Sequence, residues 1–334
     1  MTKDLIKTIL YFDIFSYPLT GDELLLYNGL HGDEARQALD ELNNLVDSGI
    51  LGYSRGFYHY RGKPAMIDRR IKGNMLAEKR MDAARKYSGI IASFPFVEAV
   101  MLSGSIAKGY MGKNDDIDYF IVTKPRRLWF VRSMLVLFKK IFLRNSYRNF
   151  CINYFVDTNH LAINEKNRFT ATEVAFLLPM FNNDIYGRMM GENPWIKDYY
   201  PIPVHRRLPP INKKRPLKKL FERILDNRLT DRLDKYLQRL SEKIIQKKFN
   251  HMGEGLFERS FSMQTNELRY LPNRQQQRIM NRFCWKMILF EKESGIQLRS
   301  RIYKYYPKAS TPSPSLQMAA QTRSMKHQKQ RVAL

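Results

Sequence analysis

The chain has 334 residues, enough for about two domains, and its 44% hydrophobic and 13% aromatic residues are typical of a folded protein rather than a disordered or collagen-like one. Its two cysteines, Cys151 and Cys284, exclude a disulfide framework and a cysteine-rich zinc site, and its six histidines lack metal-ligand spacing. The 57 Lys and Arg residues outnumber the 32 Asp and Glu residues, and the resulting net charge of +25 favours an anionic partner.

The first 64 residues predict a small helical domain that ends in a β-hairpin. Apolar residues recur at helical spacing, Thr20 and Glu23 match a capping box, and two short β-like runs flank a Ser-Arg-Gly turn. The expected elements are helices over residues 2–14, from Thr20 and over residues 33–46, and strands over residues 50–53 and 57–60. Residues 1–64 therefore resemble a winged helix-turn-helix domain.

The charge of this domain argues against DNA binding by its third helix, which would be the recognition helix. Residues 1–64 carry 6 basic and 9 acidic residues. The helix has Arg36 as its basic residue against five acidic residues, namely Asp33, Glu34, Asp40, Glu41 and Asp47. Such a helix repels phosphates that a DNA reader must approach closely. We therefore expect the domain to contact a protein partner or to serve as a packing module.

Residues 65–184 predict helices interspersed with apolar strands, which makes the chain an α+β protein. The expected elements are a basic helix over residues 66–93, strands over residues 96–102 and 150–156, a helix over residues 126–143, and a helix capped by Thr170 or Thr172. The apolar run from Leu128 to Leu143 contains three basic residues and is shorter than the roughly 20 residues of a membrane span. No secretory signal opens the chain. These patterns predict a cytoplasmic protein with no membrane partner.

The most informative segment of the chain joins two apolar runs. The first run ends at Gly104 and Ser105, and Asp116 and Asp118 lie inside the second, separated by one residue. Alternation along a strand would place both carboxylates on one face. Two buried carboxylates repel each other and lose solvation, and a divalent cation is the usual remedy. Because Mg²⁺ takes one or two carboxylates together with substrate phosphates, we predict Asp116 and Asp118 as its ligands.

Gly104, Ser105 and Lys108 are candidate phosphate-binding residues. Glycine lets the backbone approach a phosphate closely, backbone N–H groups at the start of the following turn can point at anionic oxygens, and the serine hydroxyl adds a donor. Lys108 would meet a phosphate as a point charge. A P-loop is excluded because Tyr110 and Met111 replace the Lys and Ser or Thr that this motif requires.

The spacing of these residues resembles the DNA-polymerase-β-like nucleotidyltransferase superfamily, whose pattern is Gly-Ser, about ten residues, and Asp-x-Asp between apolar residues. The resemblance covers roughly residues 95–160. It implies a mixed sheet with flanking helices, and transfer of a nucleoside monophosphate from an NTP to an acceptor with release of pyrophosphate, using two Mg²⁺ ions. It further implies that Asp116 and Asp118 hold the ions while Gly104 and Ser105 fix the β- and γ-phosphates.

The superfamily also uses a third carboxylate on a later strand. Asn153 occupies the mid-strand position where the acid is expected, and Asp157 has the correct parity but lies at the end of the strand. The resemblance implies Asp157 as a further catalytic residue that takes the proton of the acceptor, with a solvated loop carboxylate as the alternative. If Asp157 does not fill this role, we expect weak binding of the second ion or loss of catalysis.

The C-terminal half of the chain is strongly basic. Residues 205–334 carry 30 basic and 10 acidic residues. We expect a basic helical region over residues 185–306 and a disordered tail over residues 307–334. The basic runs are candidates for RNA or DNA binding, with a solvated surface as the alternative. The residues concerned are 205–219, Arg269, Arg274, Arg278 and Arg282, with Lys139 and Lys140 as candidates for steering a triphosphate and Tyr270, Phe283 and Trp285 for stacking a base.

The sequence thus predicts an α+β protein with a winged helix over residues 1–64, a nucleotidyltransferase domain over residues 65–184 and a C-terminal helical region. The expected function is Mg²⁺-dependent nucleotidyl transfer from an NTP to an unidentified acceptor. The alternative is a catalytically weak or inactive nucleotidyltransferase-fold protein that acts as a regulator by binding nucleic acid or another protein.

Overall fold

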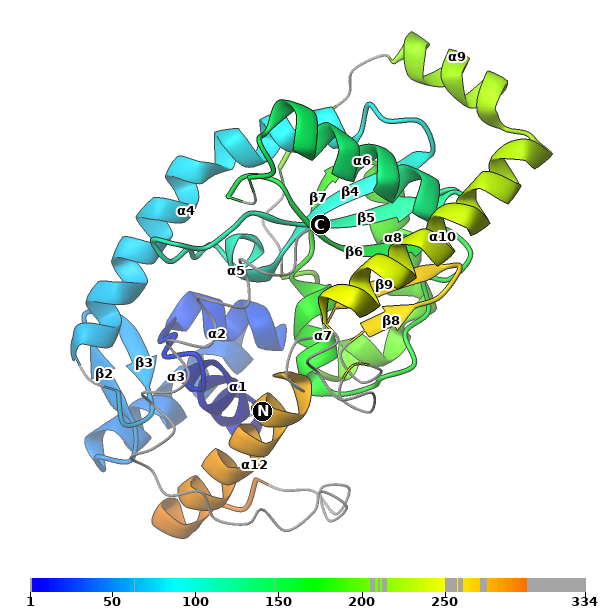
Figure 1. Ribbon diagram of the computed structural model, residues 1–334. Helices are drawn as coiled ribbons and strands as arrows, with labels where there is room; N and C mark the ends of the chain where they lie inside the picture. The colour runs from blue at the N-terminus through cyan, green and yellow to red at the C-terminus, as the bar shows by residue number, and fades with distance from the viewer. Residues whose placement is uncertain are drawn as a thin grey trace.

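The computed structural model describes residues 2–62, 64–146, 148–204, 208–209, 211, 215–249, 257, 261–270 and 275–298. In this part of the chain a six-stranded mixed sheet lies between two layers of helices, and a three-stranded sheet belongs to the N-terminal helices (Figure 1). The predicted α+β class is therefore confirmed. Among these residues no helix combines the length and the apolar character needed to cross a bilayer. The predicted tail over residues 307–334 lies outside the described residues.

The N-terminal elements are three helices and three short strands. They are α1 (Thr2–Asp13), β1 (Leu19–Thr20), α2 (Gly21–Asn28), α3 (Gly32–Asp47), β2 (Gly52–Ser54) and β3 (Phe57–His59), with the strand order β1-β3-β2. The hydroxyl of Thr20 accepts from the backbone N–H of Glu23, and the Glu23 carboxylate accepts from the N–H of Thr20, so the predicted capping box is present. The predicted order of three helices and a hairpin is present too, with β1 as an additional strand.

The central sheet has the strand order β7-β4-β5-β6-β9-β8. Its strands are β4 (Val97–Ser103), β5 (Asp118–Thr123), β6 (Cys151–Asp157), β7 (Leu178–Phe181), β8 (Phe261–Met263) and β9 (Glu267–Tyr270). The β5–β6 pair is parallel and the other pairs are antiparallel. Residues 185–306 are therefore not only helical as expected, because β8 and β9 form a hairpin that extends the sheet beside β6.

Nine further helices follow the N-terminal ones among the described residues, and several of them cover the two faces of the central sheet. They are α4 (Pro64–Ile91), α5 (Gly104–Ala107), α6 (Leu128–Phe142), α7 (Arg168–Ala175), α8 (Asn183–Glu192), the 3-10 helix η1 (Pro194–Asp198), α9 (Pro216–Leu225), α10 (Arg228–Lys248) and α12 (Gln275–Ser294). The predicted cap of α7 is wrong. Asn167 caps this helix instead of Thr170 or Thr172, since its Oδ1 accepts from the backbone N–H of Thr170.

Alternation along β5 divides the hydrophobic core into two layers. Tyr119 and Ile121 pack with α4 and α6 on one face, whereas Phe120 and Val122 pack with α7, α8 and the N-terminal helices on the other. The second layer continues into α12, which lies against α1 (Figure 1). Residues 2–62 therefore share a core with the sheet instead of enclosing a separate one.

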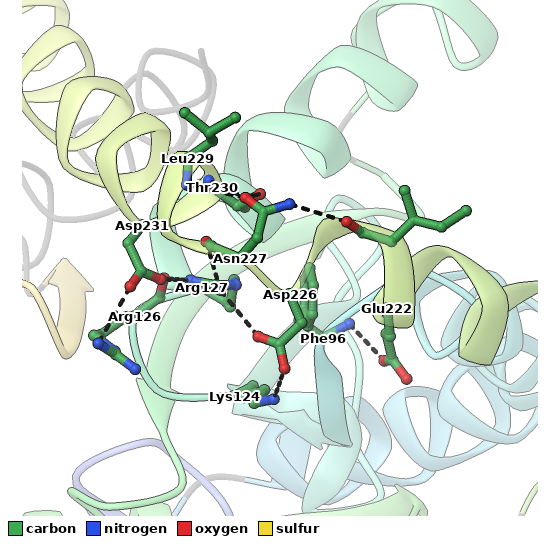
Figure 2. Close-up of polar contacts among 11 residues, drawn as sticks. Phe96, Lys124, Arg126, Arg127, Glu222, Asp226, Asn227, Leu229, Thr230 and Asp231 are labelled. Carbon is green, nitrogen blue, oxygen red and sulfur yellow. Dashed lines mark hydrogen bonds and ion pairs between the residues drawn. The ribbon is translucent and has the colours of Figure 1, made fainter.

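A network of charged residues fixes the junction between α9 and α10 to the loop after β5 (Figure 2). Arg127, whose side chain is only 3% exposed, donates to the carboxylates of Asp226 and Asp231. Lys124 pairs with Asp226 as well, and Arg126 pairs with Asp231. These ion pairs hold the end of α9 and the start of α10 against the sheet.

Candidate functional site

The Gly-Ser bend and the second aspartate of the motif meet at one point. Ser103 at the end of β4 pairs with Asp118 at the start of β5. Gly104 follows with φ of +67°, in the left-handed region that favours glycine. A Cβ on Gly104 would lie 2.6 Å from Oδ2 of Asp118. The Asp118 carboxylate therefore lies directly against the backbone of the bend.

Asp116 lies in the loop before β5, and the prediction that it belongs to the strand is wrong. Because β5 begins at Asp118, strand alternation does not place the two carboxylates on one face. Backbone hydrogen bonds fix the loop instead. The N–H of Ile117 donates to the carbonyl of Arg148 at 3.1 Å, and the carbonyl of Ile117 accepts from the N–H of Cys151 at 3.0 Å. Asp116 is thus held beside the start of β5.

Ser105 is engaged by an aspartate that the sequence did not single out. Its hydroxyl donates to Oδ2 of Asp115 at 3.1 Å, and the same oxygen accepts from the backbone N–H of Gly112 at 2.8 Å. The Asp115 carboxylate therefore connects the Gly-Ser bend to the residues just before the Asp-x-Asp run, and the segment between them forms a compact loop. The sequence offers no clear signal for Asp115, because it is the last residue of the Gly112–Asp115 turn, whereas Asp is preferred at the first position of a turn.

Lys108 contacts both the bend and helix α7. Its ammonium group lies 3.0 Å from a carboxylate oxygen of Glu173 on α7, and 3.3 Å from the carbonyl oxygen of Gly104. The backbone carbonyl of Lys108 accepts from the hydroxyl of Tyr17 at 2.7 Å. The predicted phosphate-binding lysine therefore connects the bend to α7 and to the N-terminal region, and a phosphate would compete with Glu173 for it.

The structure does not bring Asp157 to the other predicted catalytic residues. In the parallel β5–β6 ladder, Asp118 pairs with Cys151, and Thr123 pairs with Asp157. Thr123 lies five residues after Asp118 along β5, which corresponds to a distance of about 16 Å between the two pairs. Asp157 therefore lies at the opposite end of the strands from Asp118, and its expected role as a catalytic residue beside Asp116 and Asp118 is corrected.

Asp157 has a local role at that end of the sheet. Its Oδ1 accepts from the backbone N–H of Asn159 at 2.9 Å and lies 2.6 Å from Nδ1 of His160. The other candidate for the third position, Asn153, lies in β6 at an irregularity of the β5–β6 register, which passes from Ile152 to Tyr154. Neither residue supplies a third carboxylate beside Asp118.

The predicted metal ligands beside the bend are Asp116 and Asp118. Among the described residues, no group of three or more His, Cys, Asp and Glu side chains could hold a metal ion. Mg²⁺ binds in many sites through one or two carboxylates, with substrate phosphates and water completing its six ligands. Asp116 and Asp118 match that donor set, whereas the expected second ion lacks the third carboxylate that the superfamily uses for it.

Arg80 of α4 is a candidate functional residue that the sequence missed. Its Nη2 donates to the carbonyl of Arg148 at 2.6 Å and to Oδ1 of Asn149 at 2.7 Å. Burial and the neighbouring Arg148 lower the pKa of the Arg80 guanidinium, and the charge of Asp116 opposes this shift. Nη1 of Arg80 is buried and has no hydrogen-bond partner among the described residues. A buried donor beside the motif is suited to a phosphate oxygen.

A cavity of about 490 Å³ lies on the other side of the motif loop, against the first half of α4. Its lining includes Arg69 and Lys72 of α4 and Tyr110, Gly112 and Lys113 of the loop. Because neither the Gly104 bend nor Asp118 lines it, the cavity and the carboxylates are separate features that share one loop. Its basic lining is compatible with an anionic group.

The other residues predicted to bind a triphosphate, a base or a nucleic acid lie at different places in the fold. Lys139 is buried on α6, and burial lowers its pKa to about 8, so it is not a solvent-facing steering residue. Arg269 of β9 pairs with Glu165, Phe283 is buried in the core, and Trp285 is 48% exposed. Residues 205–207, 212–214 and Arg274 lie outside the described residues.

Comparison of the chain with protein-family models, with curated proteins and with solved structures finds no match. The likeness to nucleotidyltransferases therefore rests on the spacing and geometry of the motif residues alone.

Proposed function

We propose that the chain is a Mg²⁺-dependent nucleotidyltransferase that moves a nucleoside monophosphate from an NTP to an acceptor and releases pyrophosphate. The observation that carries the proposal is the contact between the Asp118 carboxylate and the backbone of Gly104. A carboxylate for the metal and a bend for the phosphates must be adjacent in such an enzyme, because one metal-bound triphosphate contacts both.

Each residue of the site has a distinct part in this proposal. Asp116 and Asp118 would hold Mg²⁺, which supplies charge stabilisation for the phosphates. The backbone at Gly104 lets a triphosphate approach closely, and the Ser105–Asp115 hydrogen bond keeps the bend in shape. Arg80 would add positive charge near Asp116. An acceptor would bring its own proton-accepting group or use water, because Asp157 is about 16 Å away along the strands.

A second candidate function is nucleotide binding without transfer, in a protein that regulates a nucleic acid or protein partner. The specific observation in its favour is the place of Asp157 at the far end of β6, which leaves Asp116 and Asp118 without the third metal-binding carboxylate that the superfamily uses. One Mg²⁺ ion suffices to hold a nucleotide, whereas the two-ion mechanism needs more oxygen ligands. The second candidate therefore keeps the nucleotide site and omits the transfer step.

The N-terminal elements support a protein-contact role in either case. Their order, three helices followed by a hairpin, is that of a winged helix, but α3 presents acidic side chains to solvent, with Asp33 97% exposed. We propose that this winged helix binds a basic or apolar protein partner in the cytoplasm rather than DNA. A pull-down with the full chain and with an Asp33→Lys, Asp40→Lys variant tests it, since loss of the captured protein is expected only in the variant.

The enzymatic proposal is tested by measuring NTP binding with and without Mg²⁺, and pyrophosphate release with RNA, protein and small-molecule acceptors. Asp118→Asn should abolish both signals, and Asp33→Asn on the exposed face of α3 should leave both unchanged. Metal-dependent binding without pyrophosphate release with any acceptor would favour the second candidate. If no NTP binds in the presence of Mg²⁺, both candidates are wrong.

A further inference from the structure

Helix α9 is amphipathic with its apolar side facing solvent. Two of its polar residues, Lys218 and Glu222, face the protein. Lys218 donates to the carbonyls of Ala92 and Val97. Glu222 accepts from the N–H of Phe96 at 2.7 Å (Figure 2). The helix buries none of its ten residues and stands off the body of the molecule (Figure 1). Its large apolar side chains are between 51% and 68% exposed, and they are Leu217, Leu220, Phe221 and Ile224.

Helix α10, which follows α9 in the chain, also exposes apolar side chains. Five large side chains on this helix recur at intervals of three or four residues and are between 40% and 71% exposed, namely Leu229, Leu233, Tyr236, Leu240 and Ile244. They flank the residues that α10 buries against the body, which are Thr230, Asp234, Ser241 and Ile245. We call the nine exposed residues of the two helices the α9–α10 apolar surface.

Such a surface requires a partner on physical grounds. A soluble protein rarely exposes a run of this many large apolar side chains unless the run is a binding site. A ten-residue helix is also marginally stable on its own, and packing of its apolar face normally holds it in place. The described part of the chain does not cover the apolar face of α9, so we look for a binding partner that does.

The charges around this surface are positive. Eight basic residues of α9 and α10 are exposed, and they are Lys219, Arg223, Arg228, Arg232, Lys235, Arg239, Lys243 and Lys247. Three acidic residues here have partners within the protein: Asp226 pairs with Lys124 and Arg127, Asp231 pairs with Arg127, and Asp234 accepts from the backbone N–H of a residue in α6. The partner must therefore combine negative charge with apolar contact.

We propose that the α9–α10 apolar surface docks on a membrane that contains anionic phospholipids, a function beyond the proposed nucleotidyl transfer. A second copy of the surface would bring like charges together, and residues 299–334 of this chain carry eight basic and no acidic residues, so neither is a fitting cover. The phosphates of a nucleic acid would pair with the basic residues, but they would offer no apolar contact to the leucines. An anionic bilayer provides both kinds of contact: the apolar side chains would lie at the acyl boundary and the basic ones among the lipid phosphates.

This is a contact with the membrane surface and not a span, in keeping with the absence of a spanning helix among the described residues. It differs from the expectation of no membrane partner, which rested on the search for a spanning or secretory segment. The docked helices would place the rest of the protein at the membrane, held by the Arg127 network at the α9–α10 junction (Figure 2).

The test is co-sedimentation of the full chain with phosphatidylserine–phosphatidylcholine vesicles and with pure phosphatidylcholine vesicles. We expect salt-sensitive binding to the anionic vesicles alone. Leu220→Ser with Phe221→Ser should weaken it about tenfold or more, and Arg232→Glu with Arg239→Glu should do the same. The matched controls are Met75→Ser on α4, which is 57% exposed, and Lys79→Glu on the same helix, and both should bind as wild type.

Three outcomes would overturn the proposal. One is binding to anionic vesicles that the Leu220→Ser, Phe221→Ser variant retains in full, because the contact would then be purely electrostatic. Another is a dimer in solution that this variant dissociates, which would assign the surface to a second copy. The third is absence of vesicle binding together with RNA binding that the same variant loses. Circular dichroism of each variant shows whether it has folded, and since the substituted side chains are exposed we expect unchanged spectra.

Discussion

The hydroxyl of Ser105 and the carboxylate of Asp115 are joined by a hydrogen bond of 3.1 Å, ten positions apart in the chain. The same carboxylate accepts from the N–H of Gly112, so Asp115 holds the loop between the bend and β5 at two points. The metal-binding candidates follow it directly. The shape of the site thus depends on an aspartate that is not itself proposed to touch the substrate.

We predict that Asp115→Ala lowers the free energy of unfolding by about 1–3 kcal/mol, because a backbone N–H and a hydroxyl lose their acceptor. It should also weaken Mg²⁺-dependent nucleotide binding. Urea denaturation and nucleotide titration measure the two effects. Lys113→Ala, an exposed change in the same loop, is the control and should stay within about 0.5 kcal/mol of wild type. Equal effects of the two substitutions would contradict the role given to Asp115.

We predict that Gly104→Ala displaces the Asp118 carboxylate. The substitution forces alanine into the left-handed region, at a cost of about 1–2 kcal/mol, and places a methyl group 2.6 Å from Oδ2 of Asp118. Gly49→Ala is the matched control, since Gly49 has φ of +72° and a Cβ at this position would have no neighbouring atom within 4 Å. Both variants should lose similar stability in urea. Nucleotide binding should fall in Gly104→Ala alone, and retention of full binding there would separate the bend from the site.

The positions of most helices and of β4 and β6 were predictable, because long apolar periodicities and turn residues determine them. The start of β5 was not. The apolar residues that follow Asp116 favour a strand that includes it, but the hydrogen bond from Gly112 to Asp115 forms a turn there and the strand begins at Asp118. The β8–β9 hairpin was missed because its strands have only three and four residues in a basic region, and their pairing with β6 is a long-range contact.

Asp157 shows a different limit of sequence analysis. The alternation of side chains along a strand predicts the face of the sheet on which a residue lies. It does not predict which residues of the neighbouring strand lie beside it. Because β5 and β6 are parallel, a residue at the end of β6 lies level with the end of β5, where Thr123 is, and not with Asp118 at its start. The direction of pairing depends on the whole topology, which the motif spacing does not contain.

We predict that stability falls as the pH rises from about 4 to 6 because of Asp234. Burial raises the pKa of its carboxyl to about 6. The unfolded chain releases this proton near the ordinary value of about 4, whereas the folded protein keeps it, so the folded state is favoured at low pH and loses that advantage through this window.

The shift of Asp234 corresponds to about 3 kcal/mol, because each pKa unit is worth about 1.4 kcal/mol. Asp234→Asn cannot titrate and its amide oxygen can still accept from the N–H of Phe130. Urea unfolding at several pH values should show this variant gaining stability relative to wild type between about pH 4 and pH 6.5. Asp33→Asn on the exposed face of α3 should show no such trend, and a difference between Asp234→Asn and wild type that stays constant with pH would contradict the assignment.

We predict that Arg127→Ala costs about 3 kcal/mol, whereas Arg126→Ala costs less than about 1 kcal/mol. The two side chains point at the same carboxylate, Asp231, but Arg127 is 3% exposed and Arg126 is 75% exposed. Removing Arg127 loses the packing of a buried side chain and its hydrogen bonds to two carboxylates, whereas the exposed pair of Arg126 is screened by water. The hydrogen bond from Arg127 also lowers the pKa of Asp231, so its stabilisation is present above the ordinary pKa and lost as the pH falls below it. Urea unfolding at pH 7 and pH 3 should therefore show Arg127→Ala losing less stability on acidification than wild type, and equal losses for the two arginine variants at pH 7 would contradict the buried network drawn in Figure 2.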